Sequence, residues 1–69
     1  MTKTTHCYVT RVEGKDGAAI EYLKKDGKWT FDKGEAIDLP EDCVSTFIKM
    51  AQKDPENAGY AINHIVDIR

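Results

Sequence analysis

One amphipathic segment, near residues 40–53, most limits how this 69-residue chain can fold. Apolar residues recur there at i, i+3, i+4 and i+7, the spacing of one buried helix face: Val44, Phe47, Ile48 and Ala51. Asp38 and Glu41 precede this stripe with the spacing of a capping box, which predicts Asp38 as the N-cap. Asp54-Pro55 would end the helix. The sequence therefore predicts one helix that must bury a single apolar face.

Strand-like segments and glycine turns alternate before the helix. We expect strands near residues 6–12, 18–24 and 28–32, and residues 35–39 are extended enough to form a short fourth strand. The turns between them are Gly14-Lys15-Asp16-Gly17, Lys25-Asp26-Gly27-Lys28 and Asp32-Lys33-Gly34. Asp-Gly is a favoured pair in tight hairpins. These segments favour an antiparallel meander.

The C-terminal part of the chain, residues 61–68, fits two patterns. Apolar residues alternate with polar ones as in a strand, but some of the same residues also fall at helical spacing after Asp54-Pro55. Gly59 interrupts the helical pattern, and Ile65, Val66 and Ile68 are β-branched. We therefore prefer a strand, with the helix as the alternative.

These elements predict one α+β domain over residues 1–69, a small antiparallel β-meander of three to four strands followed by one amphipathic helix and a C-terminal strand. The helix would pack on one sheet face. The predicted core consists of Val9, Val12, Ile20, Leu23, Trp29, Phe31, Val44, Phe47, Ile48, Ala51, Ile62 and Val66. Strand alternation cannot place both Val9 and Val12 on one face, so one of them should lie outside this core.

The two cysteines, Cys7 and Cys43, do not form a disulfide framework. The N-terminal residues lack the apolar stretch of an export signal, and no apolar run approaches a membrane span. We therefore expect a cytoplasmic protein with free thiols. Neither C-x-x-C nor H-x-x-x-H spacing occurs around His6 and His64, so we expect no metal and no cofactor.

Catalytic patterns are also missing. Cys43 lies near the helix N-terminus, where a thiol can be activated, but Glu41 and Asp42 oppose that effect. Ser45, the only serine, has no nucleophile motif around it, and the glycines belong to hairpin turns rather than to a phosphate loop. We expect no catalytic residues, no small-molecule substrate and no enzyme activity.

Charge is small and uneven along the chain. The net charge of −2 combines +2 over residues 1–34 with −4 over residues 35–69. A basic aromatic strand surface is nevertheless conceivable where Lys24, Lys25 and Lys28 lie beside Trp29, with Tyr22 and Phe31 nearby. Single-stranded nucleic-acid binding on this surface is the alternative function, which the weak positive charge disfavours.

Protein contact is the function class that the sequence opposes least. A small sheet leaves an unpaired edge, on the first or the last strand, that invites pairing with another chain. We therefore predict a protein-binding module that forms a symmetric homodimer or inhibits another protein. An external partner would meet the outer helix face (Glu41, Asp42, Ser45 and Lys49) or the turn lysines (Lys24, Lys25 and Lys28).

In size, acidity and order of elements, the chain is similar in type to small phage-encoded or prophage-encoded proteins that bind and block a host protein, anti-CRISPR proteins among them. The similarity involves no alignable motif, so no functional position follows from it. It implies only that an inhibitory role is worth testing.

Overall fold

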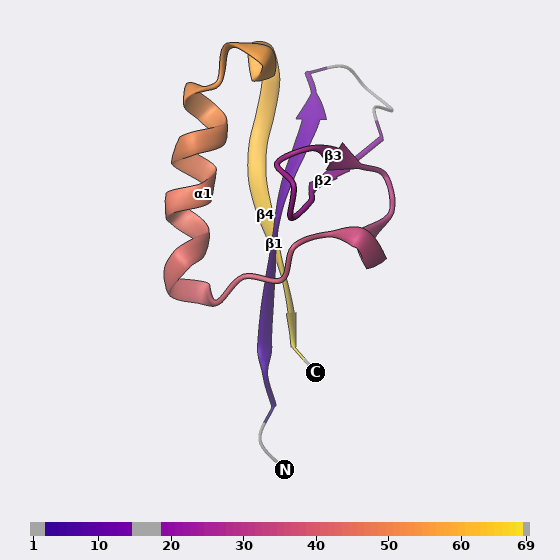
Figure 1. Ribbon diagram of the computed structural model, residues 1–69, viewed down its shortest axis with the longest axis vertical. Coiled ribbons are helices and arrows are strands. Elements are labelled where there is room, and N and C mark those ends of the chain that lie inside the picture. Colours follow the sequence, from indigo (N-terminus) through magenta and orange to yellow (C-terminus); the bar gives the residue numbers. More distant parts are fainter. Residues whose placement is uncertain (1–2, 15–18, 69) are drawn as a thin grey trace.

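The computed structural model describes residues 3–14 and 19–68. It is an α+β fold with a four-stranded antiparallel sheet in the order β3-β2-β1-β4 and one helix packed against it (Figure 1). The elements are β1 (Thr5–Glu13), β2 (Glu21–Leu23), β3 (Trp29–Thr30), α1 (Glu41–Lys53) and β4 (Tyr60–Ile68), with short 3-10 turns η1 (Lys33–Glu35) and η2 (Pro55–Asn57). The predicted fold class is confirmed, and the C-terminal segment is a strand, not a helix.

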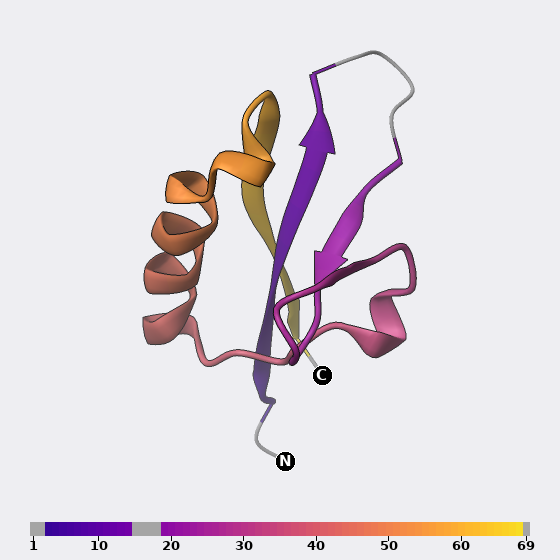
Figure 2. The ribbon, with the colours of Figure 1, turned by 45° about the horizontal axis from the view of Figure 1, so that its top comes forward.

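The long pair formed by β1 and β4 is the axis of the molecule. Its antiparallel register is unbroken over nine residues, from Thr5 opposite Ile68 to Glu13 opposite Tyr60. Figures 1 and 2 show α1 to one side of this pair and the β2–β3 hairpin with η1 to the other. In the order β3-β2-β1-β4, the outer strands are β3 and β4, and β1 lies between β2 and β4. The expectation that the first strand could be an open edge is therefore wrong.

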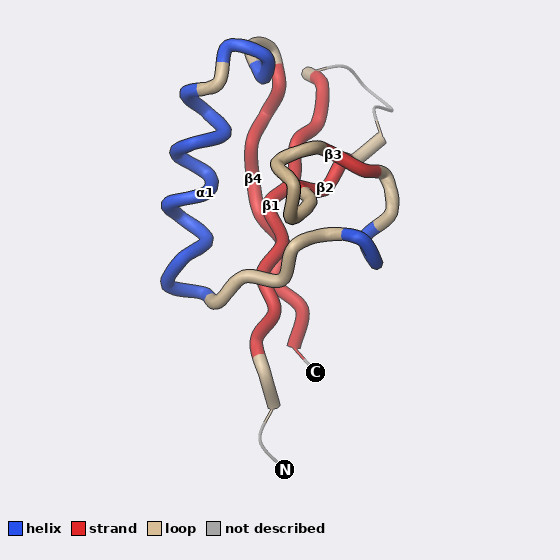
Figure 3. The backbone as a smooth tube through the Cα atoms, in the orientation of Figure 1, coloured by secondary structure: helices blue, strands red, loops and turns tan. Residues whose placement is uncertain are grey.

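The second and third strands of the meander are shorter than the sequence predicts, whereas β1 is slightly longer. β2 and β3 span three and two residues, and much of the chain around them is loop (Figure 3). Residues 35–39 do not form a fourth strand but make two isolated bridges, Ala36 with Lys24 and Leu39 with Cys7. Asp32 bends the chain before them, because its carboxylate accepts the Gly34 N–H at 2.9 Å. The predicted turn at residues 14–17 falls largely on residues 15–18, which lie outside the described part of the chain.

The centre of the core consists of buried Cys7, Val9, Leu39 and Val44. Six half-buried residues surround them, namely Leu23, Trp29, Ile37, Phe47, Ile48 and Ile62, and Ala51 is also buried. Val12 lies on the opposite sheet face from Val9, as alternation requires.

Three residues predicted for the core are exposed: Ile20 by 44%, Phe31 by 68% and Val66 by 48%. The first two lie just outside the short strands β2 and β3. Val66 lies on an outer strand. The predictions for Phe31 and Val66 are wrong because strand length and sheet order decide their exposure. The prediction for Ile20 is wrong because residues three apart on a strand, such as Ile20 and core-facing Leu23, point to opposite sheet faces.

The helix starts without the predicted capping box. Pro40 is the N-cap residue and gives no side-chain cap, and the Asp38 carboxylate pairs instead with Nδ1 of His6. Backbone hydrogen bonds of 3.1 and 3.0 Å between Leu39 and Cys7 keep the chain extended up to Pro40. Helical geometry therefore begins three residues after Asp38, too late for its side chain to reach the first turn. The predicted end is confirmed, since Asp54 is the C-cap residue.

Candidate functional site

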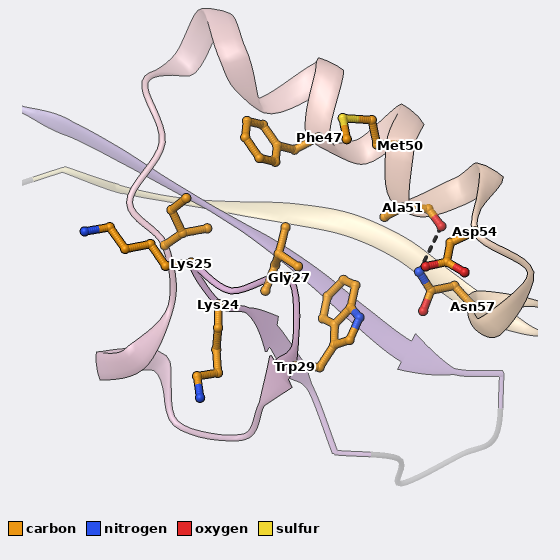
Figure 4. A pocket seen from close by; sticks show the side chains of 11 residues that line it. Lys24, Lys25, Gly27, Trp29, Phe47, Met50, Ala51, Asp54 and Asn57 are labelled. Carbon is orange, nitrogen blue, oxygen red and sulfur yellow. Dashed lines mark hydrogen bonds between the residues drawn. The ribbon is translucent and has the colours of Figure 1, made fainter.

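A cleft of about 210 Å³ lies between α1 and the turn that joins β2 to β3 (Figure 4). Phe47, Met50 and Ala51 of the helix line one side, and Leu23 and Trp29 of the hairpin line the other. Lys24, Lys25 and Asp54 contribute polar groups. Pockets for drug-sized ligands usually measure about 300–1,000 Å³, so this cleft is small for such a ligand.

Local sequence explains why the hairpin turn reaches over the cleft. Gly27 has φ +84°, a left-handed conformation that glycine adopts without a steric cost. The turn is closed by a hydrogen bond of 3.1 Å from the Gly27 N–H to the Lys24 carbonyl. Asp26 accepts the Lys28 N–H at 3.0 Å, and this bond, helped by the positive charges of Lys24 and Lys28, lowers the pKa of the Asp26 carboxyl. Interactions among Lys24, Asp26, Gly27 and Lys28 therefore hold the turn in its conformation.

Arg11 joins several polar and aromatic side chains next to Trp29, which lines the cleft. Its guanidinium donates to the Glu21 carboxylate at 2.6 Å and to Oδ1 of Asn57 at 2.7 Å. It also lies 4.7 Å from the centre of the Trp29 ring and 4.4 Å from that of Tyr60. Buried Asn57 in turn donates to the Ala51 carbonyl at 2.9 Å, the dashed line in Figure 4. Arg11 thus ties β1 to the hairpin, to η2 and to β4.

The predicted partner-binding residues lie in two groups. Glu41, Asp42, Ser45 and Lys49 are all exposed on α1, whereas Lys24, Lys25 and Lys28 belong to the β2–β3 turn. Among the described residues that line the cleft, only Lys24 and Lys25 come from the predicted set. The structure therefore does not gather the seven predicted residues into one surface.

The aromatic residues near the turn lysines do not share a face. Register pairs Tyr22 with Thr30 and Leu23 with Trp29, so the Tyr22 and Trp29 side chains point to opposite sides of the sheet. One face of the Trp29 ring is already occupied by the Arg11 guanidinium. Stacking of successive bases needs neighbouring aromatic faces that are free. This geometry gives the nucleic-acid alternative little support.

The outer edge of β4 is the second candidate surface, and sequence reasoning left it undecided. β4 is a nine-residue outer strand, and its last residues place Val66 and Ile68 at the surface with exposures of 48% and 62%. Natural edge strands are commonly protected by lysine, proline, bulges or short length. β4 contains no lysine or proline, and its pairing with β1 is unbroken. Its one charged residue, Asp67, forms an ion pair of 3.0 Å with Lys33.

The two thiols differ sharply in their surroundings. Cys7 is completely buried and Cys43 is exposed, both as free cysteines. Burial, followed by the negative charges of Glu41 and Asp38, raises the pKa of the Cys7 thiol. We expect Ellman's reagent at neutral pH to modify Cys43 alone in the folded protein and both thiols after unfolding. Equal reaction rates of the two thiols in native buffer would contradict the buried position of Cys7.

Within residues 3–14 and 19–68, no three His, Cys, Asp or Glu side chains gather as a metal site would require. No helix in the described part of the chain is long and apolar enough to cross a membrane. No protein-family model, curated protein or solved structure matches the chain.

Proposed function

We propose that this domain is a non-catalytic protein-binding module and that its partner adds a strand along the open edge of β4. The observation that carries the proposal is the long outer strand with exposed Val66 and Ile68 at its end. Strand addition obtains affinity from main-chain hydrogen bonds and specificity from alternate side chains. The exposed C-terminal half of β4 offers both.

The other surfaces support this function less well. The cleft is small, and the exposed side of α1 carries mainly polar side chains such as Glu41, Ser45 and Lys49. Solvated helix faces of this kind are ordinary in monomeric proteins. A long outer strand without lysine, proline or a bulge is less ordinary, because it risks uncontrolled association.

The partner would be either another copy of the chain or an external target that the module inhibits. Inhibition of a host protein, in the manner of small phage or prophage proteins, is one form of the second possibility. Both forms of the module would act in the cytoplasm with reduced thiols. Neither needs a cofactor or a small-molecule substrate.

Selection of displayed peptides tests whether the edge binds polypeptide chains. Random nine-residue peptides would be selected on the immobilised domain, and the recovered peptides would be titrated by fluorescence polarisation. We expect binding to the unaltered protein and its loss in Val66→Pro, which removes one backbone donor of β4 and fills the edge with a ring. Lys49→Ala, on the exposed side of α1, is the matched control and should bind as the unaltered protein does.

Recovered peptides that bind Val66→Pro equally well would contradict the proposal, as would a failure to recover any peptide on a domain that also stays monomeric. A labelled oligothymidine in the same assay tests the alternative. We expect it not to bind at physiological salt. Salt-sensitive binding that disappears when Lys24, Lys25 and Lys28 are neutralised together would instead favour the nucleic-acid function.

A further inference from the structure

We propose that the partner of the β4 edge is a second copy of this chain, paired antiparallel over His64–Ile68 with Val66 opposite Val66 of the second copy. This inference rests on the proposed function, since it requires that the edge binds a polypeptide. It goes further by naming the partner and the register. Three observations carry it: the direction of the backbone groups, the position of the helix, and the symmetry of the side chains.

The direction of the backbone groups follows from the other edge of β1. Both the N–H and the carbonyl of Cys7 bond to Leu39, at 3.1 and 3.0 Å, so they point away from β4. In an antiparallel sheet, both groups of one residue point the same way and alternate residues point oppositely. Cys7 and Val66 are therefore a non-hydrogen-bonded pair, and the N–H and carbonyl of Val66 point to the open edge. The same alternation directs the backbone N–H and carbonyl groups of His64 and Ile68 to the open edge.

The helix leaves this half of the edge accessible. In Figure 1, the N-terminal end of β1 and the C-terminal end of β4 extend beyond the first turn of α1. Burial along β4 agrees with the picture, because Tyr60 and Ile62 are half-buried whereas His64, Val66 and Ile68 are exposed. These three residues are also the ones whose backbone groups point outward. A second strand would therefore find its hydrogen-bonding groups on the uncovered segment.

The side chains of this segment suit pairing with themselves. A twofold axis at Val66 makes hydrogen-bonded pairs of all three outward residues, with His64 facing Ile68 of the second copy on both sides of the axis. The Val66 side chains would meet each other and remove exposed apolar surface from water. Asp67 points to the other sheet face, where Lys33 lies 3.0 Å away, so no like charges meet. Pairing would join the two sheets, with both helices on one face.

Two measurements on the unaltered protein test the association. Sedimentation equilibrium over a concentration series should show the mass rising from the 7.8 kDa monomer toward twice that value. Amide hydrogen exchange over the same series should slow at His64, Val66 and Ile68. The amides of Ile65 and Asp67, which point toward β1, should be protected at every concentration. This alternation distinguishes edge pairing from association through another surface.

Charge substitution tests the register. Val66→Lys places two positive charges face to face across the axis and should weaken dimerisation at least about tenfold. Val66→Glu should do the same with negative charges. An equimolar mixture of the two variants places opposite charges together and should restore dimers. Thr46→Lys, which adds one charge on the exposed side of α1, is the matched control and should dimerise normally.

A chain that stays monomeric at the highest attainable concentration would overturn this inference. So would a dimer that Val66→Lys leaves intact, or a mixture of the two charge variants that does not reassociate. Each of these three results can be told apart from a failure of the proposed function. Displayed peptides that depend on Val66 would still show an edge that binds other chains, whereas their absence together with a monomer would remove both proposals.

Discussion

Truncation of Phe47 to alanine is expected to lower the free energy of unfolding by about 2–3 kcal/mol. Phe47 packs against the buried cluster of Cys7, Val9, Leu39 and Val44, but it is only half-buried because its other side lines the cleft. A fully buried phenylalanine typically costs about 3–5 kcal/mol on truncation. Small domains rarely have more than about 3–5 kcal/mol in total, so this variant should be close to unfolding at room temperature. Urea unfolding followed by circular dichroism measures the loss.

Met50→Ala is the matched control for the Phe47 prediction. Met50 lines the same cleft from the next turn of α1, but its side chain is 63% exposed. Its truncation should change the free energy of unfolding by less than about 0.5 kcal/mol. Equal losses in the two variants, or an unchanged urea midpoint in Phe47→Ala, would mean that Phe47 does not support the core.

The parts of the fold that depend on local pattern could be predicted from the sequence. The apolar stripe of α1 is visible because four residues repeat at helical spacing, and in the structure Val44 and Ala51 are buried while Phe47 and Ile48 are half-buried. The final strand could be chosen over a helix because Gly59 interrupts the helical pattern. Gly59 has φ +87°, a conformation that turns the chain sharply just before β4 begins. Both predictions used residues close together in the chain.

The features that the sequence did not predict depend on contacts between distant residues. Asp38 has the spacing of a cap, yet the bond between Leu39 and Cys7, 32 residues apart, holds the chain extended and moves the helix start. The outer position of β4 follows from β1 pairing with both neighbours, which no local pattern reports. The open edge could therefore be expected in general but not assigned to a strand.

The Arg11 cluster was missed although a signal for it exists. Alternation along β1 puts Arg11 on the same face as Cys7 and Val9, so the sequence places a charged residue on the core side of a strand. A buried charge requires a partner and further hydrogen bonds. Glu21 and Asn57 provide them, but they lie 10 and 46 residues away in the chain. The need for partners was predictable, whereas their identity was not.

Replacement of Arg11 by alanine is expected to cost about 3 kcal/mol of folding free energy. Only 16% of its side chain is exposed, and 18% of that of Glu21, so the substitution leaves a largely buried carboxylate without its cation. The substitution also leaves Oδ1 of Asn57 without the N–H that Arg11 donates to it, and it removes the cation that stacks on Trp29 and Tyr60. Chemical unfolding with a constant m-value would measure this loss directly.

Two further variants show whether the loss comes from the charge or from its geometry. Arg11→Lys keeps the charge but cannot bond Glu21 in a fork while reaching Asn57, so it should recover only part of the stability. Glu21→Gln combined with Arg11→Ala should cost less than the two single losses added together, because the carboxylate is no longer left uncompensated. Additive losses, or an Arg11→Ala protein as stable as Lys49→Ala, would show that the cluster does not hold β1 to the hairpin and to β4.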